Sequence, residues 1–152
     1  TGAYDVSFLD GFTFNSANSV FSNGGVLAMA GTAVVDSTST VIIDTGSLLS
    51  LSTPTFLVTN TVMAVDRPTS LGSSVAFIVT QASDSIQFFD TVDGAFDLSA
   101  DGSGDIQFGA DVGGLTPLDS LTSAIPVELN GELQAVIADQ AQSFSAGLRL
   151  AK

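Results

Sequence analysis

The chain has 152 residues with 45% apolar side chains, a net charge of −13 and only three basic residues. Nucleic-acid binding requires cationic side chains that neutralise phosphates, so this composition excludes it, and the same sign of charge disfavours anionic membrane surfaces. The absence of His and Cys removes the commonest general base, thiolate metal sites and disulfides. We therefore expect a single all-β domain over residues 1–152, with a sizeable core, no catalytic residue and no required cofactor.

Short runs rich in Val, Ile, Phe and Thr are separated by clusters of Gly, Asp, Ser and Asn, a pattern typical of strands and turns. No run approaches the ~18–20 apolar residues that span a bilayer, so we expect no membrane insertion. In Glu128–Gln142 apolar residues recur at helical spacing, but Asn130-Gly131 interrupts them; we expect strand–turn–strand, with a short helix as the alternative. The expected strands, in chain order, are Val6–Phe8, Phe12–Phe14, Val26–Met29, Ala33–Val35, Val41–Ile43, Leu48–Leu51, Phe56–Val65, Val75–Thr80, Ile86–Phe89, Ala95–Leu98, Ile106–Phe108, Leu115–Leu118, Val127–Leu129, Leu133–Ile137 and Phe144–Leu150.

Residues 84–100 and 104–120 repeat each other at an interval of twenty residues, which makes 84–120 the clearest repeat in the chain. Six of the seventeen aligned positions are identical, whereas unrelated segments would share roughly one. A fixed interval of short β-segments is typical of a chain that coils and stacks on itself. The identical pairs are Ile86 and Ile106, Gln87 and Gln107, Phe88 and Phe108, Val92 and Val112, Gly94 and Gly114, and Leu98 and Leu118.

This repeat favours a parallel β-helix, an all-β solenoid with coils of about twenty residues stacked at ~4.8 Å. Identical residues would then lie above one another, with the Ile and Phe pairs pointing inward and the Gln pair outward. Gly94 and Gly114 would both occupy a corner with positive φ. The alternative is a β-sandwich or jelly roll, which also has many short strands but no reason to repeat them in register. Residues 1–40 follow the interval only weakly, as a cap or an assembly arm would.

Several segments carry a resemblance to a known family: Gly104–Ala110 (GDIQFGA), Val112–Leu121 (VGGLTPLDSL), Leu129–Gly131 (LNG) and Gln142–Gly147 (QSFSAG). Together they make residues 84–150 resemble the β-strand repeats of large secreted bacterial surface proteins, the filamentous-haemagglutinin-like adhesins. Residues 1–80 depart from that pattern. The resemblance implies an extracellular or cell-surface scaffold or adhesive segment with no reaction of its own.

Aspartates are the residues that most suggest chemistry. Asp93, Asp97, Asp101 and Asp105 recur at intervals of four, and a glycosidase-type pair would need two carboxylates at ~5–9 Å. Asp97, Asp101 and Asp105 also resemble a Ca²⁺ loop in composition, although their spacing departs from the EF-hand pattern. We expect these side chains to lie at turns and corners, with Ca²⁺ binding by the last three as the alternative.

The composition and the repeat together predict a non-enzymatic structural or adhesive protein that self-associates into a filament or surface matrix. The edges expected to mediate this are Phe144–Leu150 and Val6–Phe14, because open strand edges at the ends of a β-helix favour association. Phe89 is expected to cover a gap beside Gly109, with contact to a partner as the alternative. A glycan or a host receptor is a candidate partner of the chain. Two functions of other classes are the alternatives: a β-sandwich subunit of a pilus or virion shell, and a Ca²⁺-dependent glycan-binding module.

Overall fold

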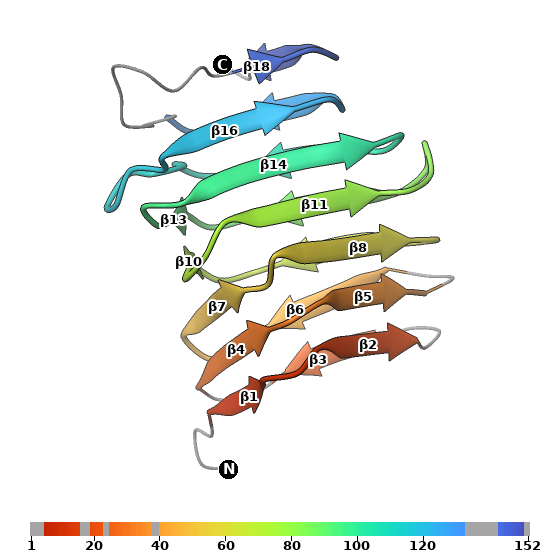
Figure 1. Cartoon of the computed structure of the whole chain (residues 1–152), viewed down its shortest axis with the longest axis vertical. Helices are drawn as coiled ribbons and strands as arrows, with labels where there is room; N and C mark the ends of the chain where they lie inside the picture. Colours follow the sequence, from red (N-terminus) through yellow and green to blue (C-terminus); the bar gives the residue numbers. More distant parts are fainter. Residues whose placement is uncertain (1–4, 16–18, 23–24, 38–39, 133–142, 151–152) are drawn as a thin grey trace.

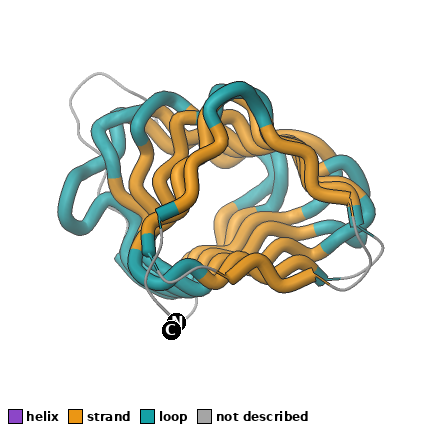
Figure 2. Tube along the Cα trace, turned by 90° about the horizontal axis from the view of Figure 1, so that it is seen from below, coloured by secondary structure: helices purple, strands orange, loops and turns teal. Residues whose placement is uncertain are grey.

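The computed structural model describes residues 5–15, 19–22, 25–37, 40–132 and 143–150, and this part of the chain contains strands and turns but no helix (Figure 2). The strands form three sheets, all paired in parallel. Sheet A contains β1 (Val6–Phe8), β4 (Val26–Ala30), β7 (Leu48–Ser52), β10 (Thr69–Leu71) and β13 (Val92–Asp93). Sheet B contains β2 (Phe12–Asn15), β5 (Ala33–Asp36), β8 (Thr55–Thr59), β11 (Val75–Val79), β14 (Asp97–Gly102), β16 (Ser120–Ser123) and β18 (Ser143–Phe144). Sheet C contains β3 (Ser19–Ser22), β6 (Val41–Asp44), β9 (Val62–Val65), β12 (Ser85–Phe88), β15 (Asp105–Phe108), β17 (Val127–Leu129) and β19 (Leu148–Leu150).

From β1 to β15 successive strands rotate through sheets A, B and C, and β16 to β19 belong to sheets B and C, so the chain winds as a solenoid from the first coil at the bottom of Figure 1 to the last at the top. Ile86 pairs with Ile106 twenty residues later, and Leu98 pairs with Leu121 twenty-three residues later. The parallel β-helix expected from the repeat is therefore confirmed. The β-sandwich alternative is wrong, because a sandwich is built from antiparallel hairpins and Greek keys.

The core is a continuous apolar column inside the coils. Side chains alternate between buried and half-buried along many of the strands, as in β11 (Val75–Val79), because successive side chains of a strand point to opposite faces. Buried residues from all three sheets form one cluster. The predicted inward stacking of Phe88 on Phe108 is confirmed, with ring centroids 5.6 Å apart.

The twenty-residue alignment is correct as far as Val92, which bridges to Val112, and fails beyond it. Leu98 pairs with Leu121 and not with Leu118, because residues 113–117 form a loop that lengthens this coil by three residues. Gly94 has the expected positive φ of 140°, but in the next coil positive φ occurs at Gly113 and not at Gly114. The side chain of Leu115 is 86% exposed in that loop, so the strand expected at Leu115–Leu118 is wrong.

Other expected strands differ in their bounds. The run Phe56–Val65 is two strands, β8 and β9, that meet at a corner where Asn60 has a φ of 56°. The segment Phe144–Leu150 likewise contains two strands, β18 and β19, on different sheets. The expected strand Leu133–Ile137 lies outside the described residues. So does most of Glu128–Gln142, for which a short helix was the alternative. The strands absent from the sequence prediction are β3, β10, β13 and β16, and the expected strand Ala95–Leu98 covers only the start of β14.

The N-terminal residues share the architecture of the rest. Strands β1 and β2 pair in parallel with β4 and β5, and β3 pairs with β6. In the described part of residues 1–40, the expected cap or arm therefore belongs to the solenoid itself: β4 and β5 lie in the second coil, and β1, β2 and β3 form the first coil. This coil lies at the end of the stack opposite β18 and β19 (Figure 1).

Candidate functional site

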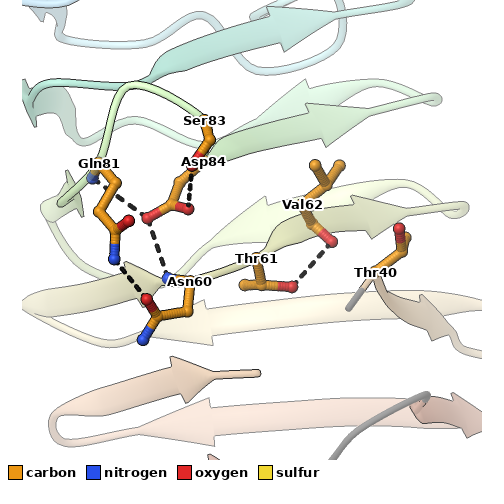
Figure 3. A pocket seen from close by; sticks show the side chains of 7 residues that line it. All are labelled: Thr40, Asn60, Thr61, Val62, Gln81, Ser83 and Asp84. Atoms are coloured by element: carbon orange, nitrogen blue, oxygen red, sulfur yellow. Dashed lines mark hydrogen bonds between the residues drawn. The ribbon is translucent and has the colours of Figure 1, made fainter. Parts of the chain in front are cut away.

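The corner groove lies where the chain passes from sheet B to sheet C, and has a volume of about 460 Å³. The β8–β9 turn and the β11–β12 turn supply most of its lining. Figure 3 shows Asn60 and Gln81 turned toward each other, and the Asp84 carboxylate directed at the turn below it. The lining residues are Thr40, Asn60, Thr61, Val62, Gln81, Ser83 and Asp84.

Asp84 is the structural centre of the corner groove. Its side chain is only 2% exposed. Its Oδ2 accepts hydrogen bonds from the backbone N–H of Asn60 at 3.0 Å, from the backbone N–H of Gln81 at 3.1 Å and from Thr80 Oγ1 at 3.3 Å. A buried carboxylate must be compensated by donors of this kind. The bond to Asn60 holds the coil below in its left-handed corner, which Asn tolerates better than most residues.

The outer groups of the corner groove also bind one another. Asn60 Nδ2 donates to Asp36 Oδ1 at 2.9 Å, and Gln81 Nε2 donates to Asn60 Oδ1. The hydroxyl groups of Thr80 and Thr59 share a hydrogen bond at 2.8 Å. Each of these bonds joins residues of adjacent coils. The arrangement therefore clamps three successive coils together, and its chemistry is that of a structural lock.

The aspartates singled out in the sequence do not converge. Asp97 and Asp101 both belong to β14, and residues four apart on a strand lie roughly 13 Å apart. Asp105 belongs to β15 in sheet C. In the described part of the chain, no group of three or more acidic side chains is placed to hold a metal ion. The alternative of a Ca²⁺ loop formed by Asp97, Asp101 and Asp105 therefore has no shared site in the described residues.

Most of these carboxylates stabilise turns and neighbouring strands. Asp97 Oδ1 accepts from Ser120 Oγ at 2.6 Å in the next coil. Asp101 Oδ1 accepts from the N–H of Gly102 at 2.7 Å. Asp93 Oδ1 accepts from the backbone N–H groups of Leu115 and Thr116 at 2.8 and 3.2 Å, which fastens the 113–117 loop to the coil below. These contacts agree with the expectation of turn and corner roles.

Asp105 differs from the others. Its Oδ1 is buried and has no hydrogen-bond partner among the described residues. Burial, and then the negative charge of Glu128 in the next coil, raise the pKa of the Asp105 carboxyl above its usual value. Glu128 Oε2 in turn lies 3.9 Å from Arg149 Nη1 on β19. These three side chains border a cavity of about 190 Å³ on the outer face of sheet C.

The two end coils expose residues that occupy core positions. Leu148 and Leu150 are in register with the buried Val127 and Leu129. Nevertheless they are 39% and 65% exposed. At the opposite end, Phe12 and Phe14 are only partly buried against the core, although their partners in the next coil, Ala33 and Val35, are fully enclosed.

Phe89 follows β12 directly, and its side chain is 57% exposed. The backbone of Phe89 and Phe88, rather than the Phe89 ring, is what lies nearest to Gly109. The gap-covering role of the Phe89 ring stays a prediction. Contact of this ring with a partner stays a prediction.

The corner groove was missed in the sequence because its members are separated by one coil. Asn60 and Asp84 are twenty-four residues apart, an interval that the 84–120 repeat does not show. The available signal was local: Asn60 interrupts the apolar run Phe56–Val65, and Asn is a turn residue that accepts positive φ. That interruption would have placed the corner, but not its hydrogen-bond partners.

Comparison of the chain with models of known protein families, with curated proteins and with solved structures finds no match. Within the described residues there is also no helix long and apolar enough to cross a membrane.

Proposed function

We propose that the chain is a non-enzymatic structural or adhesive β-solenoid that acts outside the cell or at its surface and self-associates into filaments or a matrix. The observation that carries this proposal is the exposure of Leu148 and Leu150 at inward core positions of the last coil. Apolar surface at such a position is stabilised by removal from water, at ~25 cal/mol per Å². A further coil stacked on β19 would bury both side chains.

The sheet edges support the same proposal. Strands β2 and β3 lie at one edge of sheets B and C, and β18 and β19 lie at the other. An edge strand presents backbone N–H and C=O groups that template pairing with another chain. Proteins that avoid such pairing place charges or prolines on the edge, whereas Ser143–Phe144 and Leu148–Leu150 contain a single charged residue, Arg149, and no proline.

The flanks of the solenoid support a scaffold more than a binding site. In the corner groove, the polar side chains bind one another across coils. Location outside the cell is supported by the resemblance of residues 84–150 to secreted bacterial surface repeats. The alternative of a pilus or virion-shell subunit assumed a β-sandwich, whereas the fold is a parallel β-solenoid. The Ca²⁺-dependent glycan module loses its proposed ligands, because Asp97, Asp101 and Asp105 do not converge.

The test is a concentration series followed by light scattering after size exclusion and by negative-stain electron microscopy. It should be run with and without Ca²⁺, at physiological and at raised salt. Raised salt is included because the net charge of −13 makes copies repel one another until that repulsion is screened. We expect filaments or large oligomers that do not depend on Ca²⁺. A monomer under every condition would overturn the proposal.

A further inference from the structure

We propose that copies of this chain associate head-to-tail, with the last coil of one copy continuing into the first coil of the next in the same parallel register. In sheet B, β18 of one copy would pair with β2 of its neighbour, and in sheet C, β19 would pair with β3. This inference rests on the proposed self-association, and adds to it the partner surface, the polarity and the register.

The direction of the strands determines the polarity. All strand pairs in the described residues are parallel. A neighbour that continues sheets B and C in this way must present its first coil to the last coil of the copy before it. If two like ends met instead, one copy would be inverted. Its strands would then run antiparallel, and the order of its three sheets around the axis would be reversed, so only one sheet could align.

The core columns determine the register. Phe144 continues a column of inward residues that runs through sheet B to Phe12 at the other end of the molecule. A neighbour stacked in register would therefore place its Phe12 beside Phe144 and its Thr13 beside Ser145. The Phe12 ring already contacts Phe8, at a centroid distance of 4.7 Å, so an aromatic layer would cover the exposed end. From Phe144 the column passes through Ser123, Ala100, Phe77, Phe56 and Ala33 to Phe12.

The distribution of charge along the chain favours the same polarity. Residues 143–152 contain two basic residues, Arg149 and Lys152, and no acidic residue. Residues 1–35 contain two acidic residues, Asp5 and Asp10, and no basic residue. Unlike ends therefore attract each other, whereas like ends repel, and complementary charge of this kind selects orientation. In a chain with a net charge of −13, this is the one arrangement in which the two ends carry opposite signs.

The product of such contacts is an open filament. A heterologous contact that repeats by translation along the solenoid axis never closes into a ring. Sheets B and C have seven strands each. At ~4.8 Å per strand, each copy would extend the filament by roughly 35 Å.

Cysteine cross-linking tests the register directly, because the chain has no native Cys. Thr13 and Ser145 are both exposed, and strands ~4.8 Å apart bring opposed Cα atoms within the range that a disulfide spans. The single variants T13C and S145C would be mixed in equal amounts and oxidised after assembly. We expect a disulfide-linked dimer with one chain of each variant, and a ladder of covalent oligomers from the double variant. Each single variant alone should stay monomeric on a non-reducing gel.

The outcomes separate this inference from the proposed function. If the unmodified chain forms filaments but the mixture does not cross-link, or if either single variant cross-links to itself, the head-to-tail register is wrong and self-association stands. If the unmodified chain never assembles, both are wrong. Far-UV circular dichroism of each variant shows whether the cysteines preserve the fold.

A charge variant provides a second, independent test. The substitution Arg149→Gln removes the basic residue of β19 in the last coil. Arg67→Gln, in the middle of the solenoid, is the matched control. Both arginines pair with an acid of the preceding coil, at 3.9 Å for Arg149 and Glu128 and at 3.5 Å for Arg67 and Asp44. R149Q should raise the concentration needed for assembly by roughly two- to fivefold, with a smaller change for R67Q. Equal effects of the two substitutions would contradict the proposed polarity.

Discussion

The rings of Phe88 and Phe108 stack face to face, with centroids 5.6 Å apart and planes inclined by 7°, although twenty residues separate them in the chain. Phe77 meets Phe88 edge-on at 5.6 Å, and Phe56 lies 5.5 Å from Phe77. The four rings are fully buried and come from both sheet B and sheet C. They therefore connect the two sheets across neighbouring coils, and the stability of the stack should depend on them.

Truncation of this aromatic column should be costly. Phe88→Ala or Phe108→Ala should each lower the free energy of unfolding by ~3–5 kcal/mol, because each removes a buried ring and leaves a cavity. Phe89→Ala is the matched control, and its effect should stay within ~0.5 kcal/mol because the Phe89 ring is mostly exposed. Urea unfolding followed by circular dichroism measures all three. An equal effect at positions 88 and 89 would contradict the stacked core.

The corner lock should contribute a comparable amount through hydrogen bonds. Asp84→Ala removes the acceptor of two backbone N–H groups and of the Thr80 hydroxyl. It should lower the free energy of unfolding by ~1.5–3 kcal/mol, the range for hydrogen bonds to a charged group. Asp101→Ala is the control, since its carboxylate is exposed and accepts only from the adjacent N–H of Gly102 in the described structure. Similar unfolding midpoints for the two variants would show that the lock adds no stability.

The sequence predicted the fold well where large inward residues recur at a constant interval. Ile86, Phe88 and Val92 recur at Ile106, Phe108 and Val112, and the structure pairs all three. Where the interval changes, as in the coil from Leu98 to Leu121, a fixed spacing points to the wrong partner. Loop length is set by the turn that the chain makes at that corner, and neighbouring coils need not share it.

Short polar strands are the second feature of the fold that the sequence did not predict. Strand β16 reads SLTS and β10 reads TSL, and neither has strong β-propensity. They are strands because parallel neighbours on one or both sides supply their hydrogen bonds. The candidate Ca²⁺ site failed for a related reason. The four-residue spacing of Asp97 and Asp101 would bring them together on a helix, but on β14 it separates them.

The raised pKa of Asp105 predicts how the stability of the folded chain changes with pH. Its pKa is raised in the folded state, first by burial and then by Glu128. Folding therefore favours the protonated carboxyl. The stability that this group contributes is fully present below its unfolded pKa of ~3.9 and is lost as pH rises through the higher folded pKa. At neutral pH the ionised group opposes folding.

Asp105→Asn should therefore stabilise the chain at neutral pH, and this gain should shrink as pH falls through the folded pKa of Asp105. The comparison is the difference in melting temperature between variant and unmodified chain, measured from neutral pH down to pH ~4. Asp101→Asn, at an exposed carboxylate on the preceding strand β14 of the same coil, is the control and should show a smaller and flatter difference. A gain for D105N that grows as pH falls would contradict the assigned direction.

Substitutions at two glycines distinguish the stability cost of backbone strain from that of a steric clash. Gly102 and Gly147 have φ values of 119° and 109°, which L-residues rarely adopt. A Cβ at Gly102 would clash with the carbonyl oxygen of Val79, whereas a Cβ at Gly147 meets nothing within 4 Å among the described residues. Gly147→Ala should therefore cost about 1–2 kcal/mol from strain alone. Gly102→Ala should cost at least ~3 kcal/mol, because the clash with β11 would force β14 away from it. Chemical unfolding of both variants checks the difference, and equal costs would mean that the stack accommodates a methyl group between these coils.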